Sequence, residues 1–302
     1  MNGLVGGNLR VIHEAEDHVS NYLVKTFRGQ NALLDSFQSL LIETLTLANS
    51  GIVSNGWPRD ASNYSTTLAA FSNLFRRFRA CEVLYMKGYP LDGYALMRDI
   101  KDRALLMAAI ARNMATFPEI LGATAAPVAE GGDYGKEATK RRKASEHRIM
   151  HSMVGKDSGL PVDVQKALKQ WDDLFHVEVH GGAMSLIQEL GELASGRAVQ
   201  IGPSAIQDAY TMYINRSAEL GWMVARLLPY LQTTENAFGQ SWHEKREVLD
   251  DSFRYLLEGL SDMGKKIGAA FIAMMDSKFM FKAPFYYSES DGSQLPGAQA
   301  PS

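Results

Sequence analysis

The sequence predicts an all-α protein, a helical bundle of about eight or nine helices, from two observations. Apolar residues recur at intervals of three and four through most of the 302-residue chain, as they do from Leu220 to Leu231, and this is the period of an amphipathic helix. Alternating polar and apolar residues, the pattern of a half-buried strand, are nearly absent. Because 46% of the residues are hydrophobic, the chain can bury a sizeable core.

Local signals place several helix ends. Gly88 and Pro90 separate two helices, because glycine accepts the left-handed conformation that follows a helix and proline cannot continue one. Serine caps with a partner three residues later predict helix starts at Ser204 and Ser241. The expected helices cover residues 8–28, 31–50, 61–87, 91–116, 134–154, 162–180, 183–196, 204–232 and 241–277.

Composition divides the chain into four parts. Residues 121–136 hold Pro127 and paired glycines without helical period, which predicts a flexible linker. The end of the chain is rich in Gly, Ser and Pro and is expected to be a disordered tail. The predicted parts are therefore an N-terminal helical half (1–120), the linker (121–136), a C-terminal helical half (137–280) and the tail (281–302).

Cysteine usage and charge predict an intracellular, cytoplasmic protein. Cys81 is the only cysteine, so no intramolecular disulfide can form. The chain shows no signal peptide and no apolar stretch long enough to cross a membrane. Its net charge of −3 gives no general attraction to nucleic acid. The basic run at 136–156 is interpreted as a solvated helix face, with a local phosphate-binding patch as the alternative.

Four charged residues interrupt an otherwise apolar helix, 91–116. Arg98 and Asp102 lie four residues apart, as do Asp99 and Arg103, so each pair can meet on one helix face. Buried charge is costly unless it is paired. Structural ion pairs are the favoured interpretation, and a chemical role is the alternative.

Histidines form a second cluster at helical spacing. His147 and His151 are four residues apart, and so are His176 and His180, with Asp172 one turn earlier on the second stripe. Such side chains could bind a metal ion, transfer protons, or form hydrogen bonds in a core. The chain lacks the His-Glu-x-x-His zinc motif, the phosphate-binding P-loop, the dinucleotide fingerprint and the nucleophile elbow. The sequence therefore does not indicate any of the enzyme classes that these motifs mark.

Residues 78–102 and 175–181 resemble two segments of a DUF5677-like, HEPN-like bacterial family of helical proteins. Arg98 and His180 match the family pattern, whereas Asp102 replaces a glutamate and His176 a serine. HEPN-like proteins include metal-independent ribonucleases that act as toxins or phage-defence effectors through an Arg and a His at a dimer interface. The resemblance therefore implies an RNA substrate, a homodimer, no cofactor, and catalytic roles for Arg98, Asp102, His176 and His180.

Three functions stay open. The first is a non-catalytic helical module that binds another protein or a small ligand. The second is the ribonuclease, in which His moves the proton of the 2′-hydroxyl while Arg stabilises the negative charge that develops on the phosphorane. The third is a helical bundle that binds metal through Asp172, His176 and His180.

Overall fold

A computed structural model describes residues 9–58, 61–111, 159–181, 202–204 and 207–259, with a few single positions between 140 and 148 and between 265 and 273. These residues form seven α-helices, one 3₁₀ helix and no strand, which confirms the all-α fold. The elements are α1 (Leu9–Thr26), α2 (Arg28–Asn55), α3 (Ala61–Met86), α4 (Pro90–Ala111), α7 (Val162–Gly181), α9 (Gln207–Leu227), η2 (Leu228–Leu231) and α10 (Gln240–Glu258).

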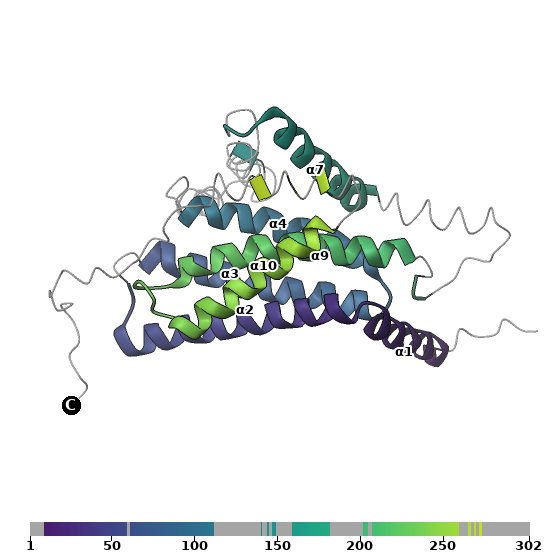
Figure 1. The fold of residues 1–302 in the computed structure, drawn as a ribbon, viewed down its shortest axis with the longest axis horizontal. Helices are drawn as coiled ribbons and strands as arrows, with labels where there is room; N and C mark the ends of the chain where they lie inside the picture. Colours follow the sequence, from purple (N-terminus) through teal and green to yellow (C-terminus); the bar gives the residue numbers. More distant parts are fainter. Residues whose placement is uncertain are drawn as a thin grey trace, which may run out of the picture.

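The long helices form one bundle around a continuous core. Helices α2, α3, α4, α9 and α10 run along the long axis, α7 lies against the outer side of α4, and α1 extends beyond the end where α2 begins (Figure 1). One hydrophobic cluster contains residues from both sides of the predicted linker, for example Phe37, Phe78 and Phe253. The linker at 121–136, the tail at 281–302 and the expected helices at 134–154 and 183–196 lie outside the described ranges, apart from single positions.

The turn between α3 and α4 confirms the roles of Gly88 and Pro90. Gly88 has a φ of 89°, in the left-handed region that glycine occupies most easily. The N–H groups of Gly88 and Tyr89 donate to the carbonyl oxygens of Tyr85 and Leu84 at 2.9 and 2.8 Å. This pair of bonds satisfies the last carbonyls of α3, and Pro90 then begins α4.

One predicted helix cap and one predicted helix end are wrong. Helix α10 begins at Gln240, with Gly239 as its N-cap at φ 79°, so Ser241 lies inside the helix and does not cap it. Helix α9 ends at Leu227, and a 3₁₀ turn follows where a continuous helix to residue 232 was expected. Pro229 stands in that turn, and proline has no N–H to continue an α-helix. The predicted cap at Ser204 borders residues 205–206, which are not described.

None of the helices within the described ranges is both long enough and apolar enough to cross a membrane.

Candidate functional site

Arg98 and Asp102 lie on one face of α4 and pair as their spacing predicts. The Arg98 Nε and Asp102 Oδ2 atoms are 3.8 Å apart, and both side chains are less than one third exposed. The second predicted pair is closer, since Arg103 Nε lies 2.9 Å from Asp99 Oδ1. Arg77 of α3 also reaches Asp99, at 3.1 Å. The charged residues of α4 therefore form ion pairs within α4 and to α3.

Lys101 is a buried cation that sequence reasoning missed. Its side chain is only 5% exposed, its Nζ lies 3.2 Å from Asp102 Oδ1, and it sits 5.4 Å from the ring centre of Trp171 on α7. Burial lowers the pKa of Lys101, and the neighbouring Asp102 opposes this shift. Attraction between an ammonium and an indole face helps to join α4 to α7.

A second buried ion pair lies on α9. Arg216 Nη1 donates to the Glu219 carboxylate at 2.6 Å, and Glu219 has no solvent exposure. Burial raises the pKa of Glu219, while Arg216 and the Trp171 indole oppose this shift. Because Trp171 of α7 lies beside both Lys101 and Glu219, it connects the charged groups of α4 with those of α9. We call Arg98, Lys101, Asp102, Trp171, Arg216 and Glu219 the charged cluster.

The two predicted histidines lie on the C-terminal half of α7, whose side chains from residue 174 onward are outside the described part. Helices α4 and α7 pack against each other, so the helix with Arg98 and Asp102 neighbours the helix with His176 and His180. No cluster of three metal-binding side chains occurs among the residues described, and the side chains of Asp172, His176 and His180 are not among these residues.

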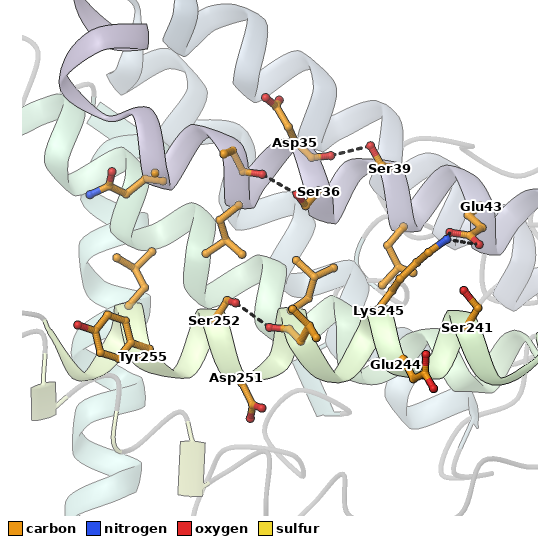
Figure 2. A pocket seen from close by; sticks show the side chains of 18 residues that line it. Asp35, Ser36, Ser39, Glu43, Ser241, Glu244, Lys245, Asp251, Ser252 and Tyr255 are labelled. Atoms are coloured by element: carbon orange, nitrogen blue, oxygen red, sulfur yellow. Dashed lines mark hydrogen bonds and ion pairs between the residues drawn. The ribbon is translucent and has the colours of Figure 1, made fainter.

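A groove with a volume of about 1250 Å³ runs between α2 and α10, and none of the charged cluster lines it (Figure 2). The two helices are antiparallel, since Trp242 Nε1 donates to Thr44 Oγ1 at 2.8 Å while Phe253 packs on Phe37 with ring centres 5.6 Å apart. These contacts hold the helices together beneath the groove. Above them, small side chains on α2 leave the space open, namely Gly29, Ala32, Ser36 and Ser39.

The groove has an apolar lining with two exposed side chains. Leu33 and Leu40 of α2 and Leu249 and Leu256 of α10 line it. Val248 and Tyr255 line it from α10, although they are 65% and 80% exposed, respectively. Adjacent exposed apolar groups are typical of a surface that another molecule covers.

The walls follow a seven-residue repeat. Residues 29, 36 and 43 line the groove from α2, and residues 241, 248 and 255 line it from α10. Positions seven apart in a helix lie on one face, and two such stripes form the holes that a third helix fills in coiled-coil packing. The arrangement therefore has the shape of an incomplete three-helix contact.

The rim of the groove is acidic. Its lining includes four carboxylates, Asp35, Glu43, Glu244 and Asp251, and one cation, Lys245. Lys245 Nζ lies 2.9 Å from both Glu43 oxygens and bridges the two helices toward one end of the groove, while Tyr255 lies toward the other (Figure 2). Desolvation and the nearby Glu82 raise the pKa of Asp35, although Arg79 opposes them.

Sequence reasoning did not find this groove, although a local signal was present. Val248 and Tyr255 are seven residues apart on an otherwise polar face of α10, and small residues recur at helical spacing from Gly29 to Ser39 on α2. Neither stripe shows that the two helices adjoin. Compared with known proteins, the chain matches no family model, no curated protein and no solved structure.

Proposed function

We propose that this protein is a non-catalytic helical binding module whose groove between α2 and α10 holds an amphipathic helix of a partner protein. The observation that carries the proposal is the pair of seven-residue stripes, at 29, 36, 43 and at 241, 248, 255, facing one apolar groove. A partner helix laid along the groove would present its own apolar stripe to Val248 and Tyr255.

The dimensions of the groove suit a helix. From Gly29 to Glu43, α2 rises about 21 Å, the length of about four helical turns. Gly29, Ala32, Ser36 and Ser39 have small side chains, which let a neighbouring helix approach to an axis separation of about 8–10 Å. A long open groove also favours an extended occupant over a compact small molecule, which proteins usually enclose more fully.

A binding measurement tests the proposal. The probe is a fluorescent, side-chain-stapled helix of about 15 residues, with leucines at heptad spacing and glutamines on its flanks. Fluorescence anisotropy with the full chain should give micromolar affinity, and Ser36→Trp should weaken it by at least about tenfold because the indole fills the groove.

Thr46→Trp is the matched control. Thr46 and Ser36 are exposed residues of α2 whose hydroxyls each donate to the carbonyl oxygen four residues earlier, but Thr46 does not line the groove. Thr46→Trp should bind the probe as the wild type does. Equal binding by all three proteins, or no binding by any, would contradict the proposal.

A metal-independent ribonuclease is the second candidate, because the helices with Arg98 and His180 are neighbours. The basis for the activity is the resemblance to HEPN-like proteins. Purified protein would be incubated with RNA, with and without a chelator, beside His180→Ala. The ribonuclease hypothesis expects chelator-resistant cleavage that His180→Ala abolishes while its cooperative melting persists. A variant that melts much earlier but cleaves RNA normally would assign His180 to the scaffold.

A further inference from the structure

We infer that the helix bound in this groove carries Lys or Arg side chains along both edges of its apolar face. The inference rests on the proposed function, since it names the chemistry of the partner for the same groove. It follows from the charges on the two walls, where they lie, and how few of them are neutralised within the protein.

Both walls of the groove carry carboxylates. Asp35 and Glu43 lie on α2, and Glu244 and Asp251 lie on α10. The one lysine of the lining is already paired with Glu43. Glu244 accepts a hydrogen bond from the neutral Gln240 amide at 2.8 Å, and Asp251 forms no ion pair with any residue that the structure describes. Three of the four carboxylates of the lining therefore have no cation within the lining that pairs with them.

The positions of these carboxylates match the flanks of a helix in the groove. Glu244 and Asp251 are seven residues apart and bracket Val248 on α10, while Asp35 and Glu43 bracket Ser36 and Ser39 on α2. In helix pairs, charged residues that flank the apolar seam form interhelical ion pairs and select the partner. Cations on both flanks of the bound helix would meet a carboxylate on each wall.

The surroundings of Asp35 also favour a cation in the partner, because they disfavour the ionised form of its carboxylate. Its carboxylate is disfavoured by desolvation and by Glu82, and Arg79, which opposes these effects, is itself paired with Glu82. A Lys or Arg beside Asp35 would favour the ionised form.

The charge on the groove also disfavours other occupants. Nucleic acid phosphates and anionic lipid headgroups would be repelled by the carboxylates along both walls. A second copy of the chain could cover the apolar stripe, and the experiment distinguishes this occupant from a basic partner.

The test compares three stapled helices that share one leucine stripe and differ only in having Lys, Gln or Glu on the flanks. Anisotropy with the wild-type chain should show the Lys helix binding about tenfold more tightly than the Glu helix, because each exposed ion pair adds only a modest increment. The double variant Glu244→Lys/Asp251→Lys should reverse this order.

Glu247→Lys/Glu258→Lys is the control, because it makes the same charge change on exposed residues of α10 that do not line the groove. It should keep the wild-type order. Equal binding of the three helices, blocked by Ser36→Trp, would overturn the inference and leave the proposed function standing. If none of the three helices binds in a way that Ser36→Trp blocks, both the inference and the proposed function are overturned. A dimer in sedimentation that Ser36→Trp dissociates would identify a second copy as the occupant and overturn the basic partner.

Discussion

Glu219 and Arg216 put a charged pair where solvent does not reach. Glu219 is wholly buried and Arg216 is 8% exposed, so both groups lose their hydration when the chain folds. Their mutual hydrogen bonds and the Trp171 indole replace part of that hydration. A buried pair of this kind adds little net stability, but removing one member leaves the other charge uncompensated.

Glu219→Ala should therefore destabilise the protein by about 3–5 kcal/mol, because Arg216 is left buried without its counter-charge. The double variant Arg216→Met/Glu219→Leu should recover most of that loss, since no buried charge remains. Urea unfolding followed by circular dichroism measures both effects. A loss below about 1 kcal/mol for Glu219→Ala would show that Arg216 finds water or another partner.

The pH dependence of stability follows from the same residue. The pKa of Glu219 is raised above its ordinary value of 4.5, so folding favours the protonated form. Its stability contribution is complete below pH 4.5 and is lost as pH rises through the raised pKa. Glu219→Gln has a side chain that does not titrate. The unfolding free energy of the wild type minus that of Glu219→Gln should therefore be larger at pH 4.5 than at pH 8. Unfolding free energies across that range provide the measurement, and a constant difference would contradict the prediction.

At the scale of the element, the turn after α3 holds the segment that precedes α9. The Ser204 N–H donates to the Gly88 carbonyl at 2.8 Å, and the Tyr210 hydroxyl bonds to the Ser204 carbonyl. A Cβ built on Gly88 would lie 2.3 Å from the Cβ of Pro203, well inside contact distance. Glycine is thus favoured at position 88 for two reasons: the turn has a positive φ, and Pro203 lies too close for a side chain.

Gly88→Ala should consequently cost more stability than Gly56→Ala. Both glycines have a positive φ, 89° and 80°, but a Cβ on Gly56 meets nothing within 4 Å. Backbone strain costs about 1–3 kcal/mol for a non-glycine residue at a position with such a positive φ. Overpacking against Pro203 should add about 1–3 kcal/mol at Gly88. Chemical denaturation of the two variants isolates the steric part, and equal losses would show that Pro203 moves aside freely.

At the scale of the whole molecule, folding leaves one apolar surface open between α2 and α10. Val248 and Tyr255 remain mostly exposed although they adjoin the leucines of the groove. Exposed apolar side chains add little to the free energy of folding. In the proposed function, these two side chains contribute to binding of the partner helix.

The double variant Val248→Ser/Tyr255→Ser should fold normally and lose helix binding. Its change in unfolding free energy should stay near 0.5 kcal/mol per substitution or below, because both positions are exposed. Affinity for the leucine-stripe helix should fall by at least about tenfold, as expected when central apolar contacts are removed. Thermal melts and anisotropy measure the two effects.

Ile42→Ser/Val53→Ser is the control for that variant. Ile42 and Val53 are 52% and 87% exposed on α2 and do not line the groove. This control should bind the helix as the wild type does. Unchanged affinity in Val248→Ser/Tyr255→Ser would remove the groove from the binding surface.

The sequence by itself determined what depends on neighbours along the chain. Helical periodicity, the break at Gly88 and Pro90, and the pairing of Arg98 with Asp102 were all predicted, because each involves residues within about one helical turn. Ser241 was assigned as a cap wrongly, since the N-cap of α10 is Gly239, two residues earlier, with a positive φ of 79°.

Only the tertiary structure decided what depends on residues far apart in the chain. Lys101 looks like a surface residue until Trp171 covers it, and Glu219 is buried because α4, α7 and α9 meet around it. The groove likewise needs Ser36 and Val248, which are more than two hundred positions apart, to face each other across two antiparallel helices. Helical periodicity shows which face of each helix is apolar or small. Packing of the whole chain selects which faces meet and which stay open, because burial is a property of the assembled bundle.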